Sequence, residues 1–215
     1  MKKKIVMLAL VAGAFVQQAN AQKGGILLYG DFNFTSQTNK VEQDFGGGTI
    51  SYKNKSTSGT FAPGIGYGVT ENIIVGLNIG ITSQTVKPDG GDKSTSSMFA
   101  AGPFVRYTKK LGGIFSVYGQ ANLSYVGGKE TVEDGYFTYD TKLSGVDFNI
   151  TPNFGADLGK GWGLDFGFGS IGFSSITNKI DDADSKSTTS GFELDLSGSS
   201  VRVGVSYMFG GGSAE

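Results

Sequence analysis

The segment NIIVGLNIGIT, residues 72–82, identifies the kind of strand from which this chain is built. Successive side chains of an extended chain point to opposite faces, so every second residue from Ile73 to Ile81 falls on one strongly apolar face. The other face carries Ile74 but otherwise glycine, Asn78 and Thr82, whereas a soluble sheet covers its hydrated face with residues such as Lys, Glu and Thr. The segment predicts a β-strand whose apolar face points either inward to a core or outward to a membrane.

The first 21 residues have the three parts of a secretory signal peptide. Lysines at positions 2–4 precede an apolar run over residues 5–16, and the small-residue triplet ANA follows at 19–21. The run is shorter than the roughly 18 to 20 apolar residues that a membrane-spanning helix needs. We therefore expect residues 1–21 to be cleaved and the mature chain to begin near Gln22.

The composition excludes several classes of function. The chain has no histidine and no cysteine, so the commonest general base, the usual zinc ligands and any disulfide framework are missing. Without the three lysines of the signal peptide, 15 basic residues remain against 19 acidic ones, which disfavours a nucleic-acid partner. We expect a protein that is not an enzyme and has no catalytic residues, cofactor or metal site.

Eight segments of the mature chain alternate apolar and polar residues, and each can supply the 9 to 11 residues of a tilted transmembrane strand. They cover residues 25–36, 58–68, 72–82, 97–107, 114–126, 142–155, 162–173 and 192–209. In the last segment the apolar positions switch from even to odd numbers, so we expect a one-residue bulge within 197–200. The pattern predicts an all-β fold, an eight-stranded antiparallel up-and-down barrel over residues 22–209, with a short tail at 210–215.

Short and long connections alternate along the chain. Residues 69–72, 108–113 and 156–161 form tight turns, while the intervals 37–57, 85–96, 127–141 and 174–190 are long and polar. An up-and-down barrel with both termini at one end has three connections there and four at the other, which agrees with this count. In an outer membrane, the short turns and both termini would be periplasmic and the four long connections extracellular.

A soluble ligand-binding barrel would show the same alternation, and the lysines separate the two alternatives. A soluble barrel needs a hydrated outer face, yet 12 of the 13 lysines after the signal peptide fall in the expected loops, turns or N-terminal tip, and only Lys142 is at a strand margin. The face opposite the apolar stripe is rich in glycine, which suits the crowded lumen of a narrow barrel. The sequence therefore favours a transmembrane barrel with its apolar face toward lipid.

Two further sets of residues fit a membrane barrel. Aromatic residues end the apolar stripes beside the tight turns, as in the interfacial girdle of such barrels; these are Tyr67, Tyr107, Phe154, Trp162, Tyr207 and Phe209. The two arginines of the chain and several carboxylates alternate onto the lumen face, and we expect them to form a buried ion-pair network there; these are Asp31, Arg106, Asp147, Asp165 and Arg202.

The segments FAPGIGYGVTENIIVGLNIGIT, FSVYGQANLSYVGG, ITPNFGADLGKGWGLDFGFG and VRVGVSYMF resemble the small outer-membrane β-barrel family, the OmpA/OmpX-type and porin-like proteins common in Bacteroidetes. The resemblance covers essentially residues 22–209. It implies a bacterial outer-membrane protein that contacts lipid and lipopolysaccharide and is inserted by the assembly machinery, without implying a particular activity. Members commonly end on an aromatic residue, whereas Phe209 is followed here by GGGSAE.

These observations favour a structural or surface-interaction protein, and a narrow channel for ions or small solutes is the alternative. Tyr136, Phe137 and Tyr139 in the interval 127–141 are candidates to contact an unknown surface ligand, unless the interval is simply a strand pair that extends above the membrane. The acidic stretches DDADSK (181–186) and PDGGDK (88–93) lack the spacing of a calcium loop, so we interpret them as solvated loop charge.

Overall fold

The protein is described by a computed structural model that covers residues 23–44, 49–134, 137–180, 185–195 and 201–210. The expected signal peptide and most of the C-terminal tail lie outside these residues. The described chain forms one antiparallel sheet of ten strands. The strands are β1 (Ile26–Asp44), β2 (Thr49–Gly68), β3 (Ile73–Pro88), β4 (Lys93–Gly112), β5 (Phe115–Asp134), β6 (Phe137–Gly159), β7 (Trp162–Gly167), β8 (Ser170–Ile180), β9 (Lys186–Asp195) and β10 (Arg202–Phe209).

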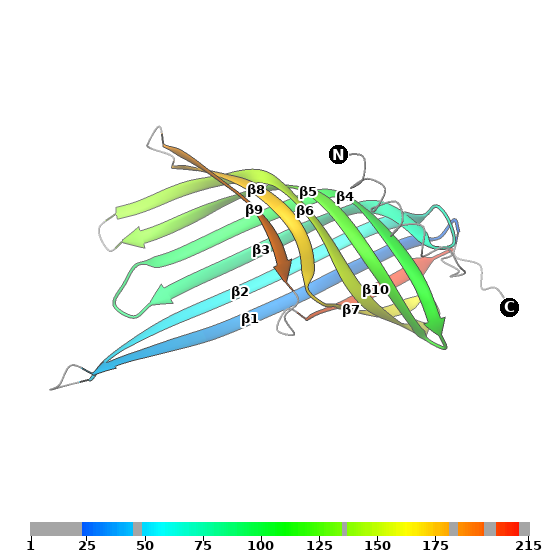
Figure 1. Cartoon of the computed structure of the whole chain (residues 1–215), viewed down its shortest axis with the longest axis horizontal. Coiled ribbons are helices and arrows are strands. Elements are labelled where there is room, and N and C mark those ends of the chain that lie inside the picture. Colours follow the sequence, from blue (N-terminus) through cyan, green and yellow to red (C-terminus); the bar gives the residue numbers. More distant parts are fainter. Residues whose placement is uncertain (1–22, 45–48, 135–136, 181–184, 196–200, 211–215) are drawn as a thin grey trace, which may run out of the picture.

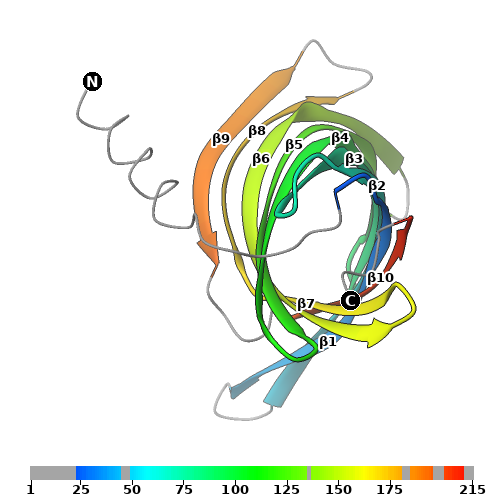
Figure 2. The same ribbon diagram turned by 90° about the vertical axis from the view of Figure 1, so that its right-hand side faces the viewer.

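The sheet closes into a ring of eight strand positions, which confirms the predicted eight-stranded barrel. Strands β1 to β6 pair in sequence order, and β6 then pairs with β7 near the tight turns and with β8 farther along. Strand β10 lies between β7 and β1 and closes the ring. Figure 2 shows this ring end-on.

The seventh and eighth positions of the ring are each occupied by two strands. Phe168 and Gly169 separate β7 from β8, and Gly169 has a φ of 59°, a conformation that glycine adopts readily. Asp195 at the end of β9 pairs with Ser170, and Arg202 at the start of β10 pairs with Gly167. Seven residue steps on the last strand therefore lie opposite three steps on its partner, so the interruption is larger than the expected one-residue bulge. Residues 196–200 lie outside the described residues. Phe192 and Val203 on its two sides are both exposed, as predicted.

The strands are much longer than the sequence indicated. Pairing continues to Asp134 opposite Phe137 and to Asp44 opposite Thr49, so most of the four intervals expected to be long loops are paired strand. These intervals are rich in Ser, Thr, Lys and Asn, so they lack the apolar alternation by which strands were recognised. Figure 1 shows the four hairpins extending from the end of the barrel opposite the tight turns.

The barrel is closed along its whole wall only near the tight turns. Strand β1 pairs with β10 from Ile26 to Phe32, and farther along it pairs with β2 alone among the described residues. Strand β9 likewise pairs only with β8 in the described part of the chain. The hairpin of β1 and β2 therefore diverges from β9, as Figure 1 and Figure 2 show.

The apolar stripe of residues 72–82 faces outward. The side chain of Leu77 is 61% exposed, whereas Ile74 on the opposite face of β3 is 3% exposed. The same outward exposure recurs around the ring, for example at Phe61, Leu123 and Val205. No helix in the described part of the chain has the length and hydropathy to span a bilayer.

Candidate functional site

An apolar plug fills the lumen near the tight turns. Leu27, Tyr29, Ile74 and Phe104 are buried together with Met208 against them, and Phe104 is only 1% exposed. The Tyr29 and Phe104 rings meet edge to face, with centroids 5.4 Å apart. Alternation placed these residues on the lumen face, but the plug itself was not predicted, because apolar residues on that face are few and widely separated in sequence.

Glycines of the neighbouring strand β2 make room for this apolar plug. A Cβ atom at Gly66 would lie 2.6 Å from Ile74 and 2.9 Å from Phe104, and one at Gly64 would lie 2.3 Å from the Tyr29 ring. Any larger residue would therefore overlap the plug. This geometry confirms that a crowded lumen is one reason for the glycine-rich face, as the sequence suggested.

Arg106 sits above the plug between two tyrosine rings. Its guanidinium carbon lies 4.6 Å from the Tyr29 centroid and 4.2 Å from the Tyr118 centroid, and its Nε donates a hydrogen bond to Gln120 Oε1 over 2.9 Å. Among the described residues, no carboxylate oxygen lies within 4.0 Å of Arg106 or Arg202. The expected direct arginine–carboxylate pairs are therefore wrong at these positions, because amide and aromatic groups occupy the places nearest to Arg106.

A chain of amide side chains continues the polar layer across the lumen. Gln120 Nε2 donates to Tyr29 and to Asn122, and Asn122 also accepts a bond from Asn78 over 2.7 Å. Asn122 Nδ2 in turn donates to Asn149, whose Nδ2 donates to Asp147 over 2.6 Å. Only the charged members of this network were predicted from the sequence. Gln120 and Asn122 lie two residues apart on one strand face, and this spacing could have predicted that amide side chains meet in the lumen.

The remaining lumen charges lie against small residues of β6, β7 and β10. Asp31 Oδ1 lies over Gly204, and the Arg202 guanidinium lies over Gly167. Asp165 is buried, and its Oδ1 lies over Gly155. Both arginines act electrostatically on Asp31 without touching it. The five predicted lumen residues thus all lie inside the barrel, and they are linked by amides, tyrosines and electrostatic attraction.

Two adjoining polar cavities occupy the lumen on the hairpin side of the plug. Their volumes are about 150 and 130 Å³, and they share Asp147, Asn149, Thr151 and Arg202 as lining residues. The larger cavity ends at Tyr29 and Arg106. The lumen is therefore a polar pocket open toward the hairpins and closed by the plug near the turns.

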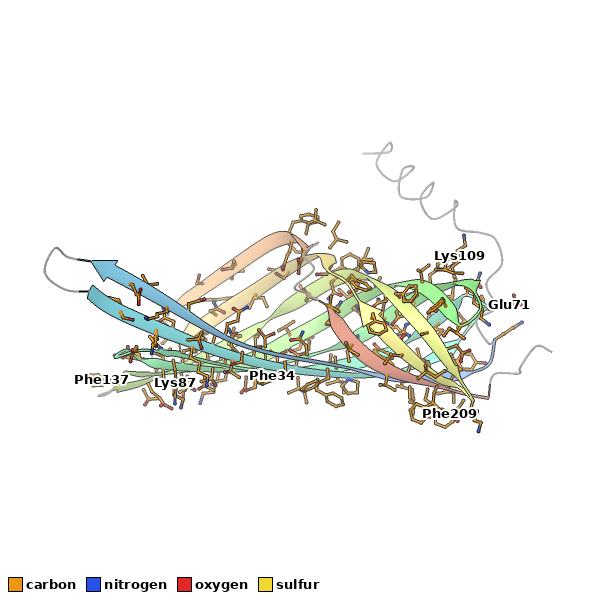
Figure 3. The ribbon with its side chains drawn as sticks, turned by 90° about the horizontal axis from the view of Figure 1, so that it is seen from below. Phe34, Glu71, Lys87, Lys109, Phe137 and Phe209 are labelled. Carbon is orange, nitrogen blue, oxygen red and sulfur yellow. The ribbon has the colours of Figure 1, made fainter. Side chains whose placement is uncertain are left out.

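The aromatic residues expected to form a girdle lie at the turn end of the wall. Trp162 and Tyr207 have ring centroids 4.8 Å apart, Tyr207 and Phe209 4.4 Å, and Phe154 packs against Phe115 at 5.3 Å. Tyr67 is 53% exposed, and Tyr107 is half-buried. Figure 3 shows Phe209 at the same end of the barrel as Lys109 and Glu71.

A second aromatic row, not predicted from the sequence, crosses the outer wall nearer the hairpins. Its members are exposed on neighbouring strands; they are Phe34, Phe61, Phe99, Tyr125, Phe148, Phe173 and Phe192. Tyr125 is ten residues from Phe115, which packs against Phe154 of the girdle. This separation is roughly 33 Å along β5, or about 25 Å in height at a strand tilt of about 40°. On β4, the eight residues from Phe99 to Tyr107 give about 20 Å. The two rows thus bound a band about as tall as the apolar band of outer-membrane barrels.

The candidate contact residues lie at the tip of the β5–β6 hairpin. Phe137 and Tyr139 are 66% and 51% exposed, with ring centroids 6.4 Å apart, while Tyr136 lies outside the described residues. The interval is a paired strand extension, as the second of the two interpretations held. By alternation, both rings are on the face of β6 that carries Asp147 and Asn149, so they border the mouth of the lumen. Figure 3 shows Phe137 at the hairpin end.

The two acidic stretches do not form a cation site in the described part of the chain. Residues 181–184 lie outside it, and Asp89 and Asp92 lie at the tip of the β3–β4 hairpin. No group of three or more Asp and Glu side chains with metal-binding geometry occurs among the described residues.

Comparison with solved structures supports the fold. The structure is similar to the outer membrane protein OprG from Pseudomonas aeruginosa, with a TM-score of 0.50 and 14% sequence identity over 88% of this chain and 98% of OprG. The chain has the fold of a bacterial outer-membrane β-barrel. Weaker similarities connect it to Ail, the attachment invasion locus protein of Yersinia pestis, and to the translocator domain of the autotransporter NalP from Neisseria meningitidis. Ail gives a TM-score of 0.47 at 11% identity over 87% of this chain and 99% of Ail. NalP gives 0.40 at 11% identity over 96% and 95%. No family model matches the sequence, and no curated protein matches it.

Proposed function

We propose that this protein is an integral outer-membrane barrel that presents four rigid hairpins at the cell surface and contacts a surface ligand with their inner faces. The single observation that carries the proposal is the length of the strands. A strand needs 9 to 11 residues to cross the membrane. Strands β1 to β6 are all longer, with 23 residues in β6, and the excess forms the protruding hairpins. A protein needed only as an anchor has no use for such extensions.

The inner faces of the hairpins differ from their outer faces in a way that suits a contact surface. Tyr139 is paired with Val132, and Val41 is paired with Tyr52 at the other long hairpin. By alternation, these residues belong to the lumen-side faces of their strands, and three of them are about half exposed. Aromatic side chains are enriched among the residues that contribute most to binding at interfaces, so these exposed rings beyond the membrane band support a contact surface.

The plug argues against the alternative of a channel. Ions would have to pass Phe104 and Ile74, which are almost completely buried among apolar neighbours. An eight-stranded barrel has an interior that side chains fill, so no second path through it is expected. We propose that the purified protein gives no stable unitary currents in a planar bilayer.

Adherence of whole cells tests the proposed function. Cells that display the protein should adhere to cultured epithelial monolayers, and the Phe137→Ser, Tyr139→Ser double variant should lose at least roughly tenfold in adherence, because an aromatic anchor contributes about 1–2 kcal/mol or more. The matched control is Leu111→Ser with Leu158→Ser, which removes equally exposed apolar residues at the turn end. Equal adherence of both variants, at equal surface amounts, would contradict the proposal.

A further inference from the structure

The lysines of the hairpin halves all lie on the outer faces of their strands. Alternation places each of them on the same face as the outward apolar residues of its own strand; they are Lys40, Lys53, Lys55, Lys87, Lys93, Lys129, Lys142, Lys179 and Lys186. Strand geometry alone does not require this, because positions on the two faces are equally frequent. Figure 3 shows Lys87 near the hairpin end of the barrel.

Four of these lysines form a continuous row across neighbouring strands. Lys129 of β5 is directly opposite Lys142 of β6, Lys142 is opposite Lys179 of β8, and Lys179 is opposite Lys186 of β9. All four side chains are exposed. Like charges directly opposite each other destabilise a sheet, so this lysine row needs a compensating negative charge.

The described residues compensate the β5–β6 half of the lysine row. Asp140 accepts an ion pair from Lys129 over 2.7 Å and is also attracted by Lys142, and these contacts with that of Thr131 lower the pKa of the Asp140 carboxyl. Within the described part of the chain, no carboxylate oxygen lies within 4.0 Å of Lys179 or Lys186. The β8–β9 half of the lysine row is therefore left with uncompensated positive charge by the described residues.

The outer wall beneath the lysine row changes in a regular order. The exposed rings of Phe173 and Phe192 belong to the upper aromatic row. Above them, Ser175 and Ser190 hydrogen-bond across the strands at 2.7 Å, and Thr177 and Thr188 do so at 2.9 Å. Lys179 and Lys186 are each six residues from the ring on their own strand, which is about 20 Å along the strand and about 15 Å in height at the usual tilt. Apolar, hydroxyl and cationic levels thus succeed one another, in the order in which a phosphorylated glycolipid presents its acyl chains and then its phosphate-bearing sugars.

We propose that the outer face of β5, β6, β8 and β9 at the lysine row binds the phosphate groups of a phosphorylated glycolipid of the outer leaflet, such as lipopolysaccharide. The inference rests on the outer-membrane location proposed above. Ammonium groups bind phosphate oxygens as point charges, and a row of them suits a lipid that carries several phosphates. The inner faces of the hairpins remain available for a surface ligand, because the lysine row occupies the opposite faces.

Binding of purified lipid A tests the proposal. The mature barrel, refolded in zwitterionic detergent with a metal chelator, would be titrated by calorimetry with diphosphorylated lipid A and with its dephosphorylated form. The wild-type protein should bind the diphosphorylated form at least about tenfold more tightly. Lys142→Gln with Lys179→Gln should lose most of that preference, whereas Lys109→Gln with Lys110→Gln, at the opposite end of β4 near the tight turn, should keep it.

Three results of these binding measurements would overturn the proposal, and a fourth concerns the neighbouring aspartates. One is equal affinity for the two lipids, the second is full preference retained without Lys142 and Lys179, and the third is equally tight binding of a soluble polyanion such as dextran sulfate. Asp181, Asp182 and Asp184, in the connection between β8 and β9, are the rival source of negative charge. Changing all three to Asn should leave or increase lipid A affinity, and a decrease would assign the phosphate dependence to another site. Heat-modifiable migration checks the fold of every variant, and cell fractionation tests the outer-membrane location separately.

Discussion

Gly76→Ala tests the packing of β2 against β3 beside the plug most sharply. A Cβ at this position would lie 2.1 Å from the Ile65 carbonyl oxygen, 2.6 Å from Gly66 Cα and 2.7 Å from Phe104 Cε1. Two of these three atoms belong to the backbone of the neighbouring strand, so the overlap can be relieved only if β2 and β3 move apart. Overpacking of this kind costs about 3 kcal/mol or more, because the displaced backbone also carries ladder hydrogen bonds.

Urea unfolding of the refolded barrel in detergent measures this loss. With a urea dependence of about 1–3 kcal/mol per molar, the unfolding midpoint should fall by roughly 1 M or more. Gly119→Ala is the matched control, because no heavy atom lies within 4 Å of a Cβ placed at Gly119. The control should leave the free energy of unfolding unchanged to within about 0.5 kcal/mol.

The Phe104→Ala background separates the two sources of overlap. The ring accounts for only one of the three close atoms, so Gly76→Ala should remain destabilising when Phe104 is already absent. A Gly76→Ala loss of less than about 0.5 kcal/mol, or an equal loss in Gly119→Ala, would refute this packing of β2 against β3.

Three further predictions concern the polar groups. Arg106→Lys should lower the free energy of unfolding by about 2 kcal/mol, because lysine cannot both stack between the tyrosines and donate to Gln120; denaturant titration measures it, and a stability equal to wild type would contradict the stacking. Asn122→Leu should cost about 2–3 kcal/mol in the same assay, since it leaves buried amide partners unsatisfied, and a neutral result would show that water replaces the amide. The Asp140 carboxyl has a lowered pKa, so it should stabilise the folded protein above about pH 4, and this stability should be lost as the pH falls through that pKa. Lys129→Gln should raise the pKa of Asp140 in a carbon NMR titration. An unchanged pKa would show that the ion pair is not formed in solution.

The membrane-facing half of the fold could be predicted from the sequence because its physical rule is simple. Lipid accepts only apolar side chains, so the outward positions of residues 72–82 repeat without interruption, and the structure exposes Leu77 and buries Ile74 accordingly. The outward direction of the side chains was also predicted on both sides of the break in the last strand, since Phe192 and Val203 both had to point outward. The size of that break could not be predicted, because alternation specifies only whether an odd or even number of residues is inserted.

A protruding strand pair was considered only for residues 127–141, and the other three hairpins were missed because both of their faces are hydrated. The tripeptide Lys-Ser-Thr occurs at residues 55–57, 93–95 and 186–188. Six residues after each of these lysines comes an outward phenylalanine, namely Phe61, Phe99 and Phe192. That recurring spacing shows an extended chain that continues above the membrane, and it was the available signal. The partners of Arg106 could not be predicted, since sequence alternation assigns a face but not which lumen residues of distant strands meet.

Hydrocarbon must cover the apolar outer face of the barrel if the protein spans a membrane, and fluorescence quenching by brominated lipid measures that contact. Trp162 is the only tryptophan of the chain, so Leu77→Trp in a Trp162→Phe background places a single probe on the outward face of β3 between the two aromatic rows. In bilayers whose acyl chains carry bromine, this probe should emit at short wavelength and be strongly quenched, and wild-type Trp162 at the turn end should be quenched less. Short-wavelength emission without quenching would place position 77 in a protein core, and that result would contradict a membrane-spanning barrel.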